Sequence, residues 1–341
     1  MRIVFLAETY PRQMSYIGTM LPKFAARHGA EVHLVALDLP PYHYAPAVAG
    51  MYARIAATAA PPSGASEAVD GYQVHLLGHR RLFGYVAARG LARTLSTLRP
   101  DVIYSFSAIG WLPLQALAYR LRHGARLFTG SHTSVSTFPL ARLRHPWLSL
   151  RGVRCFLTRW LPGRLVSLYT EKCYSPTADC GQVAVRFFGV QAAKMKVVHL
   201  GVDPDVFHPL TTVPERRQRR VLRERLACAD DEIVCICTGK LTAEKHVLLL
   251  ADAIEALRQR GLRFRGLFIG EGPLQAALAD YYRAADIGVW PGTESTSMLD
   301  AAACGLPLVV SDRIYGDHVD GNGRTYRAGE LEDLVAVPLE L

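Results

Sequence analysis

The chain has 341 residues and half of them are apolar, which is enough to bury two cores and favours two domains of similar size. No run approaches the roughly 18 apolar residues that cross a bilayer, and the first apolar run, 3–7, is too short for the core of a signal peptide. The seven cysteines show no CxxC or metal-ligand spacing, so we expect a reducing, cytoplasmic location and no disulfide framework.

The charge is divided unevenly along the chain. Residues 1–200 hold 23 Lys and Arg against 8 Asp and Glu, whereas residues 201–341 hold 16 against 22, so the halves carry net charges of +15 and −6. A basic half attracts anionic partners such as a membrane surface, a phosphorylated acceptor or nucleic acid. We expect no nucleic-acid partner, because no nucleic-acid-binding module accompanies the charge.

In the first half, short β-branched runs alternate with amphipathic helical stretches, which is the pattern of a parallel α/β sheet covered on both faces. Strands are predicted over residues 3–7, 31–36, 72–77, 102–106, 126–129 and 169–174, and helices over 19–28 and 91–98. The stretch 40–71 is rich in Ala, Pro and Gly, and its weak periodicity predicts a long loop.

The best linker starts where a strand near Lys194 runs into turn residues and then into TTVPERRQRRVLRERL, which predicts domains over 1–203 and 204–341. A second alternation follows, with strands predicted over 233–238, 264–269, 287–290 and 307–311 and helices over 247–259, 273–279 and 296–303. Cys235 and Cys237 alternate along the first of these strands as core residues do. Both halves therefore predict doubly wound domains, whose ligands bind at the carboxyl ends of the strands.

Two lysines flank the turn that follows strand 233–238. In TGKLTAEKH, Gly239 permits a tight turn, and Lys240 and Lys245 stand on either side of the start of the next helix. Two cations at such a place suit a diphosphate leaving group, because its negative charge grows as the bond breaks. The alternative is a pair of solvated lysines on a surface turn.

The stretch WPGTESTSMLDAAACGLPLVVSD, residues 290–312, places an acidic, hydroxyl-rich turn before a helix of small residues. The unpaired amides of a helix start can hold an anion, and Asp300, one turn further in, can hold sugar hydroxyls. The alternative is a capping box in which Ser297 caps the helix and Asp300 reaches back to it. Both interpretations stay open on this stretch alone.

Five segments of the second half follow one another in the order of a known family pattern. They are KVVHLGVDPDVFHP (196–209), TGKLTAEKHVLLLADAI (238–254), LFIGEGPLQAAL (267–278), YYRAADIGVWP (281–291) and LDAAACGLPLVVSD (299–312). In this order they resemble the C-terminal domain of family 4 retaining glycosyltransferases, and the first half resembles the family loosely. The resemblance implies a GT-B fold, in which two Rossmann-like doubly wound domains face each other across a cleft. It also implies that the first domain holds the acceptor and the second a nucleotide sugar.

The resemblance implies roles for individual residues of the second half. Lys240 and Lys245 match the basic positions of the family and would neutralise the diphosphate. Asp300 falls at the second of two glutamates that the family separates by seven residues, which implies a contact to the ribose hydroxyls. Gly292 stands where the first glutamate is expected, and Glu294, two residues later, is the candidate substitute.

The remaining candidates surround the donor sugar and its phosphates. Ser295 and Thr296, together with Glu294, are expected to grip sugar hydroxyls and phosphate through side chains and backbone amides. His132 resembles the family histidine near the transferred sugar. The alternative is that a histidine after a strand only forms local hydrogen bonds. Gly18 resembles the loop glycine that lets the backbone approach the diphosphate.

No carboxylate pair or Ser/His/Asp arrangement stands out as a double-displacement nucleophile with its acid. That absence suits a retaining mechanism in which the leaving diphosphate itself takes the acceptor proton. Neither an Asp-x-Asp triplet nor a His/Cys cluster occurs, so we expect no obligatory metal and no cofactor beyond the donor substrate.

The stretch ARLRHPWLSLRGVRCFLTRWLPGR, residues 141–164, contains six arginines and no acid. Phe156, Leu157, Trp160 and Leu161 are predicted on one helical face, largely apart from the arginines. Such a segment can lie on an anionic membrane, here at the inner face. The alternative is a helix whose apolar face packs into the core and whose basic face is solvated.

The sequence thus predicts a retaining, metal-independent hexosyltransferase that acts on a hydroxyl acceptor, lipid-linked or anionic, in glycan, glycolipid or glycosylated-metabolite biosynthesis. Two alternatives stay open: a sugar-nucleotide epimerase of the same architecture, and a catalytically degenerate sugar-nucleotide binder, which Gly292 suggests. Relatives carry further segments near 279/280 and beyond residue 341. We expect the protein to have them and the sequence to omit them, because a lost strand would leave unpaired edges.

Overall fold

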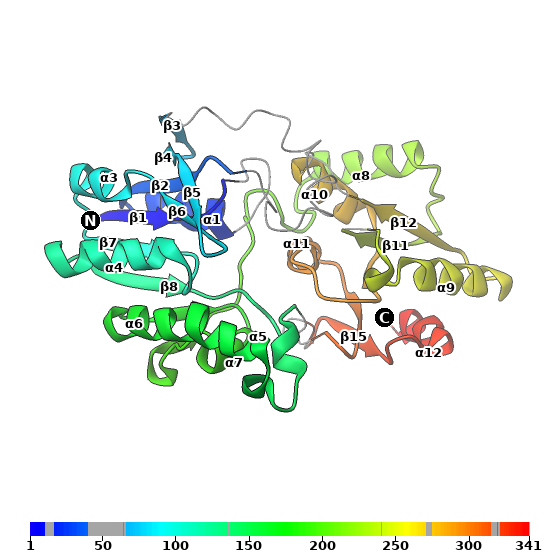
Figure 1. Ribbon diagram of the computed structural model, residues 1–341. Coiled ribbons are helices and arrows are strands. Elements are labelled where there is room, and N and C mark those ends of the chain that lie inside the picture. The colour runs from blue at the N-terminus through cyan, green and yellow to red at the C-terminus, as the bar shows by residue number, and fades with distance from the viewer. Residues whose placement is uncertain are drawn as a thin grey trace. The chain divides into compact units, whose positions relative to one another are not determined.

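The computed structural model describes residues 1–10, 17–39, 64, 66–135, 137–239, 241–270, 275–314, 319 and 321–340. The chain divides into two units, Met1–His199 and Leu200–Leu341 (Figure 1). The division falls a few residues before the predicted boundary at 203.

Unit 1 is built on an eight-stranded sheet with the order β10-β9-β8-β7-β1-β2-β4-β3. Its strands are β1 Arg2–Leu6, β2 Glu31–Leu37, β3 Ser66–Val69, β4 Tyr72–Leu77, β7 Val102–Ser105, β8 Arg126–Gly130, β9 Cys173–Ser175 and β10 Met195–Val197. Every described pair in this sheet is parallel except β3 with β4. A separate antiparallel hairpin consists of β5 (His79–Leu82) and β6 (Tyr85–Ala88).

The helices of unit 1 cover both faces of this sheet. They are α1 Ile17–Arg27, α3 Leu91–Leu98, α4 Trp111–His123, α5 Leu150–Cys155, α6 Leu161–Tyr169 and α7 Ala178–Phe187, with the π-helical segment Phe156–Trp160 between α5 and α6 and 3-10 turns at Pro139–Arg142, Pro146–Leu148 and Ala192–Lys194. Alternation along β1 explains the two layers, because Val4 and Leu6 pack into one core cluster and Phe5 into the other.

Two sequence predictions for unit 1 need correction. The predicted strand 169–174 begins too early, since Tyr169 ends α6 and the strand starts at Cys173. The predicted loop 40–71 contains β3, which pairs with β4, while residues 40–63 and 65 lie outside the described part of the chain.

Unit 2 contains a five-stranded sheet with the order β12-β11-β13-β14-β15, and all its pairs are parallel. The strands are β11 Ile233–Thr238, β12 Phe264–Ile269, β13 Ile287–Trp290, β14 Leu308–Ser311 and β15 Gly323–Tyr326. The helices are α8 Val213–Arg225, α9 Val247–Gln259, α10 Gln275–Ala284, α11 Ser297–Ala303 and α12 Leu331–Ala336, with 3-10 turns at Ala243–Lys245 and Val337–Glu340. The predicted alternation of strands and helices is confirmed.

The strands of unit 2 are buried on both faces. Val234 and Ile236 belong to one core cluster, and Cys235 and Cys237 belong to the other, as the alternation predicted. All seven cysteines are buried and free. The residues on both sides of 279/280 lie within the single helix α10, which connects β12 to β13. No helix in the described ranges has the length and apolar character needed to cross a membrane.

The stretch predicted as a linker after Leu210 is helix α8 in the structure. Thr212 and Glu215 form a capping box: the Thr212 hydroxyl accepts from the Glu215 amide at 3.4 Å, and the Glu215 carboxylate accepts from the Thr212 amide at 2.8 Å. The sequence T-x-x-E carried this signal. The many arginines concealed the helix, because they leave little apolar periodicity.

Polar contacts bind α8 to the sheet. The buried Arg223 guanidinium donates to the carbonyl oxygens of Ala229, Glu232 and Ala284 at 2.7–3.0 Å and to Asp286 at 3.0 Å. The Asp286 carboxylate also accepts from the Val234 amide at 2.8 Å, at the start of β11. One guanidinium thus donates to three backbone carbonyls and one carboxylate at the start of β11 and the end of α10.

We expect Arg223→Ala to lower the unfolding free energy of unit 2 by about 3 kcal/mol, because Asp286 loses one of its two arginine partners, Arg219 being the other, and the carbonyls of Glu232 and Ala284 lose this donor. The matched control is Arg220→Ala, whose partner Glu224 lies 3.7 Å away on the exposed side of α8. That change should cost about 0.5 kcal/mol or less. Urea denaturation followed by circular dichroism measures both, and equal losses would contradict the role assigned to Arg223.

Candidate functional site

The carboxyl ends of β11 and β13 are joined by hydrogen bonds around Thr238. The hydroxyls of Thr238 and Tyr282 are 2.8 Å apart in the interior. The Trp290 indole N–H donates to the Thr238 carbonyl at 3.1 Å. The next residue, Gly239, has a φ of +127°, which glycine adopts without strain. The ends of the two strands therefore provide a fixed base for the loops that follow them.

The loop after β13 is held by its carbonyl oxygens. The Tyr326 hydroxyl donates to Pro291 O at 2.6 Å, and the Ser311 hydroxyl donates to Gly292 O at 2.8 Å. The Lys245 ammonium donates to Thr293 O at 3.0 Å and to Glu294 O at 2.7 Å. Four consecutive carbonyls thus accept side-chain bonds from β15, β14 and the 3-10 turn before α9. We call residues 291–294 the pinned loop.

Gly292 has no room for a side chain. A Cβ atom at this position would lie 2.2 Å from the Glu244 carbonyl oxygen and 2.6 Å from the Lys245 Cα. The backbone of the 3-10 turn therefore fills the space that the first family glutamate would need. Only glycine therefore fits at this position of the structure.

Lys245 lies against the pinned loop, where two of its ammonium hydrogens bind carbonyl oxygens. In the structure, Lys245, a predicted phosphate-binding residue, therefore holds the pinned loop in place. Lys240, its predicted partner, lies outside the described residues.

Asp300 lies in the first turn of α11 and is half-buried. Among the described residues, no group donates a hydrogen bond to its carboxylate. Burial raises the pKa of the Asp300 carboxyl to about 7. A carboxyl group without a protein donor at the carboxyl edge of a doubly wound sheet can accept hydrogen bonds from a polar ligand.

The capping-box alternative for this helix is wrong. Thr296 is the N-cap residue and makes no side-chain cap bond, and Ser297 is the first helical residue. The Ser297 hydroxyl lies 2.8 Å from the Ser295 hydroxyl and 3.2 Å from the Trp290 indole nitrogen that donates to it. Of the predicted donor-site residues here, Glu294 and Thr296 are exposed and Ser295 is half-buried.

Two predicted residues belong to unit 1. His132 follows β8 and keeps an exposed part, while protein atoms around the ring remove water from it; this desolvation lowers the pKa of the imidazole and favours the neutral ring at pH 7. Its Nε2 lies 3.1 Å from the position of a Cβ on Gly130, so glycine there leaves space for the ring. Gly18 lies in the first turn of α1, where an added Cβ would come no closer than 4.0 Å to the Phe106 ring.

Three polar residues at the carboxyl edge of unit 1 escaped the sequence analysis. Glu8 follows β1 and is half-buried, and burial raises the pKa of its carboxyl. Asp38 follows β2, and its carboxylate lies 2.5 Å from the His79 Nδ1 just after β4. The parallel register of β1, β2 and β4 brings these positions to one edge. The signal in the sequence was a polar residue one or two positions after each strand.

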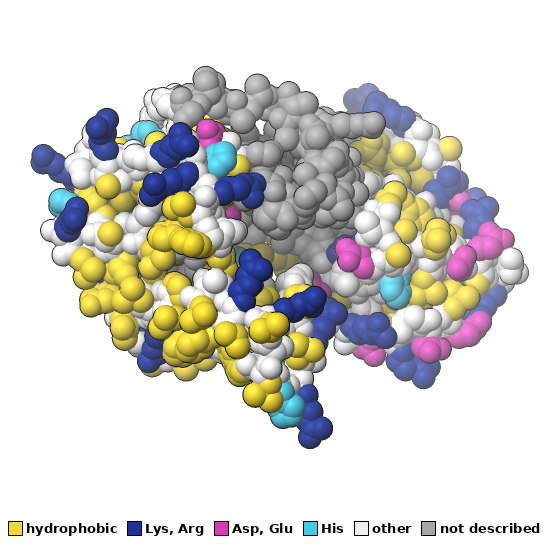
Figure 2. All heavy atoms as spheres, viewed as in Figure 1, with side chains coloured by type: hydrophobic (Ala, Val, Ile, Leu, Met, Phe, Trp, Pro, Cys, Tyr) yellow, Lys and Arg dark blue, Asp and Glu magenta, His cyan; other side chains and the backbone are white. Residues whose placement is uncertain are grey.

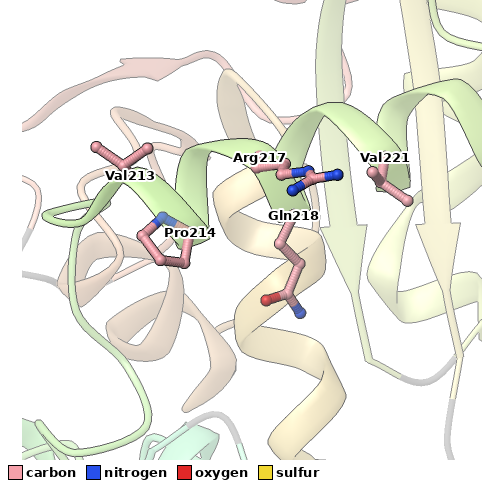
Figure 3. A pocket seen from close by; sticks show the side chains of 5 residues that line it. All are labelled: Val213, Pro214, Arg217, Gln218 and Val221. Atoms are coloured by element: carbon pink, nitrogen blue, oxygen red, sulfur yellow. The ribbon is translucent and has the colours of Figure 1, made fainter.

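A hollow of about 400 Å³ on unit 2 lies elsewhere. Figure 3 shows that its lining side chains all come from α8, with Gln218 directed toward a neighbouring helix. The Gln218 amide donates to Asp280 of α10 at 2.7 Å. The hollow is open and contains none of the predicted site residues, so the chemistry at the strand ends locates the candidate site better.

In the described part of the chain, no group of three or more His, Cys, Asp and Glu side chains is arranged to hold a metal ion. The expected independence from metal remains a prediction.

Comparison with known sequences gives a family match. The profile described as Glycosyltransferase Family 4 matches residues 20–206. A GDP-mannose-dependent alpha-(1-6)-phosphatidylinositol dimannoside mannosyltransferase of Mycobacterium tuberculosis is 28% identical over 263 residues, covering 67% of this chain and 62% of that protein. A D-inositol 3-phosphate glycosyltransferase of Xylanimonas cellulosilytica is 31% identical over 208 residues, 49% of each chain. The chain therefore spans about three fifths of the first of these relatives and half of the second.

Solved structures show the fold. A sucrose-phosphate synthase from Thermosynechococcus elongatus superposes with a TM-score of 0.64 at 12% identity, over 100% of this chain and 89% of that one. The Anabaena protein Alr3699/HepE in complex with UDP gives 0.61 at 15% identity with the same coverage. The predicted GT-B architecture with two Rossmann-like domains is confirmed.

We expect Gly292→Ala to destabilise unit 2 by about 2 kcal/mol, because the added methyl overlaps the backbone of Glu244 and Lys245 and the pinned loop must shift. The control is Gly201→Ala, where a Cβ meets no atom within 4 Å. Thermal unfolding of both variants measures the difference. An unchanged midpoint for Gly292→Ala would show that the close approach does not constrain this loop.

Proposed function

Because the chain belongs to glycosyltransferase family 4, we propose that it transfers a hexose-type unit from a nucleoside-diphosphate sugar to a hydroxyl acceptor, with retention of configuration. The observation that carries this proposal is the half-buried Asp300 carboxyl, which has no donor in the described protein and lies in the first turn of the helix that follows the pinned loop. Such an acceptor suits vicinal hydroxyls, and ribose presents a pair of them.

We assign the donor to unit 2. Asp300 accepts hydrogen bonds from the ribose hydroxyls, and Lys240 and Lys245 neutralise the diphosphate. Glu294, with Ser295 and Thr296 beside it, contacts the donor sugar and phosphate. Gly239 lets the chain approach them closely. Lys245 acts twice in this scheme, as a cation and as the residue that orders the loop.

In the reaction, the bond between the anomeric carbon and the diphosphate oxygen breaks while a bond to the acceptor oxygen forms on the same face. The acceptor proton passes to the leaving diphosphate. The protein supplies position and charge stabilisation, so the step needs neither a protein nucleophile nor a metal, and no cofactor beyond the donor.

The acceptor falls to unit 1, whose net charge of +15 over residues 1–200 favours anionic partners. His132, as a neutral imidazole, can orient a hydroxyl of the transferred sugar, and Gly18 permits backbone approach to the diphosphate. Glu8 and the Asp38–His79 pair are the new candidates for binding acceptor hydroxyls.

The relatives named above are called GDP-mannose-dependent and D-inositol 3-phosphate glycosyltransferases, so GDP-mannose and an inositol phosphate are the first substrates to test. We place the enzyme in the cytoplasm, in peripheral contact with the inner face of the membrane through residues 141–164.

A donor screen tests the proposal. GDP-mannose, followed by UDP-, ADP- and dTDP-sugars, is added to the protein during thermal unfolding, and transfer to inositol phosphate is followed in parallel. A donor at about 100 times its dissociation constant should add about 2.7 kcal/mol of stability. Conversion of the sugar nucleotide without acceptor would favour the epimerase, and a shift without turnover would favour a degenerate binder.

We expect Lys245→Ala to remove most of the donor-induced stabilisation, since both the charge and the loop contact are lost. Lys245→Gln separates the two roles, because an amide can still donate to Thr293 O but carries no charge. Lys172→Ala, an exposed lysine of unit 1, is the control. An undiminished shift in Lys245→Ala would refute the phosphate assignment, and full rescue by Gln would restrict Lys245 to positioning.

The pKa of Asp300 predicts a pH dependence. With a folded pKa of about 7 against an ordinary value of 3.8, the group favours folding below about pH 4, and this stability is lost as the pH rises through 7. Donor affinity should instead increase as the pH rises, if the Asp300 carboxylate accepts hydrogen bonds from the ribose hydroxyls. We expect affinity for an intact sugar nucleotide to increase up to about tenfold between pH 6 and 8, since ionisation follows the pKa.

Isothermal titration calorimetry with intact sugar nucleotide avoids the free nucleoside diphosphate, whose terminal phosphate titrates near pH 6. Asp300→Asn should bind more weakly and lose the pH dependence, whereas Asp252→Asn, on the exposed side of α9, should keep it. A pH profile that survives in Asp300→Asn would assign the titration to another group.

A further inference from the structure

The segment from Pro139 to Tyr169 presents many of its large apolar side chains to solvent. The exposed fractions are 86% for Leu148, 90% for Leu150, 49% for Val153, 41% for Phe156, 57% for Leu157, 51% for Leu161, 47% for Leu165 and 51% for Leu168. Single exposed leucines are ordinary on protein surfaces, but a contiguous group of this size marks an interaction site. We call these eight residues the leucine face. In Figure 2, yellow side chains gather over the lower left of the view, where Figure 1 places α5 and α6.

The leucine face is a continuous stripe. From Leu150 its members recur every three or four residues through α5, the π-helical segment and α6. This is the spacing of one side of a helix. Of the four residues predicted to share a helical face, Phe156, Leu157 and Leu161 are exposed, whereas Trp160 is half-buried and stacks on Phe156. The exposure of these three side chains contradicts the core-packed alternative.

Small residues occupy the inward side of the same helices. A Cβ on Gly152 would lie 1.9 Å from the Pro146 carbonyl oxygen, and one on Gly163 would lie 2.0 Å from the Phe188 carbonyl oxygen. Cys155, Val166 and Ser167 are also buried. The inward side of these helices is therefore formed by small residues and Val166, with close backbone contacts, and the larger leucines lie on the outward side.

The tip that carries Leu148 and Leu150 is rigid. Between them, the Ser149 hydroxyl accepts from the Gly152 amide at 3.0 Å and donates to the Pro146 carbonyl at 2.8 Å. The Trp147 ring packs edge-on against Phe156 at 6.3 Å. The two most exposed leucines of this face therefore project from a fixed turn.

The chain segment that carries the leucine face contains only positive charges. No Asp or Glu occurs between Asp101 and Glu171, and nine arginines lie in that interval. Arg144, Arg151 and Arg154 are exposed and make no ion pair within the described ranges. Two copies of the chain packed through this face would bring arginines together without a carboxylate, which disfavours a dimer.

We propose that the leucine face docks unit 1 onto an anionic lipid bilayer, with Leu148 and Leu150 inserted at the headgroup boundary and Arg144, Arg151 and Arg154 on lipid phosphates. Apolar insertion and arginine contact with anionic lipid reinforce each other at such an interface. The face supplies the contact for the peripheral location proposed above. Lipid binding is measured without a transfer assay, so a failure here leaves the transferase proposal standing.

Vesicle sedimentation of the full chain tests the proposal. We expect binding to phosphatidylcholine vesicles containing about one third phosphatidylglycerol, little binding to phosphatidylcholine alone, and release at high salt. The double variant Leu148→Ser/Leu150→Ser should bind at least about tenfold more weakly, because it removes two inserted side chains. Leu248→Ser is the matched control, since Leu248 is 76% exposed on α9 of unit 2. All these positions are exposed, so the variants should fold, and thermal unfolding checks that they do.

A fluorescent label locates the contact. Because all seven native cysteines are buried, Leu150→Cys can be labelled selectively with an environment-sensitive dye, and Leu248→Cys gives the control. Anionic vesicles should shift the emission to the blue at position 150 and leave position 248 unchanged. Equal binding to neutral vesicles, or none to either kind, would overturn the proposal. So would a dimer, seen by light scattering, that the double variant dissolves, because the face would then join two copies.

Discussion

The candidate donor site depends on one constraint, the attachment of the pinned loop through its carbonyl oxygens. Tyr326, Ser311 and Lys245 come from three separate elements and fix four successive peptides. In a planar trans peptide the carbonyl and the N–H point in opposite directions, so each bond also fixes the direction of the next amide. The loop is ordered before any ligand arrives, which removes part of the entropy cost of binding. Gly292 is required for this arrangement, because the turn before α9 occupies the space of a side chain.

Elements stabilised by apolar periodicity could be predicted from the sequence. The bounds of β11, β12, β13 and α9 coincide with their predicted ranges, because alternation and helical spacing arise from burial on both faces of the sheet. Helix α8 was mistaken for a linker because an arginine binds it to the sheet through carbonyl groups, and such bonds leave no hydrophobic pattern. The start of β9 was misplaced for a related reason. The end of α6 carries exposed leucines outside and small residues inside, so its polarity does not identify it as a helix.

The candidate site could be predicted only in part. The resemblance of motifs predicted a binding role for Asp300, but its raised pKa, and its lack of a donor among the described residues, follow from packing that the motif does not contain. The contact of Lys245 with the pinned loop joins residues almost fifty positions apart, and the pairing of Asp38 with His79 depends on the register of β2 and β4. A sequence motif identifies which residue types stand close together along the chain. Which of their polar groups already bind other protein groups depends on contacts between residues far apart in the sequence.

The two units carry net charges of opposite sign, so each would have to bind an anion in a different way. Residues 201–341 carry a net charge of −6, so a diphosphate is repelled at long range and must be held by local groups; the two lysines in that half both follow β11 in the sequence. Burial raises the pKa of Asp300 to about 7, which removes part of a nearby negative charge at neutral pH and keeps an acceptor for hydroxyls. Residues 1–200 carry +15, and their acid-free interval surrounds the leucine face. Under the two proposals, unit 2 holds a small anion by short-range contacts and unit 1 meets an extended anionic surface through its long-range field.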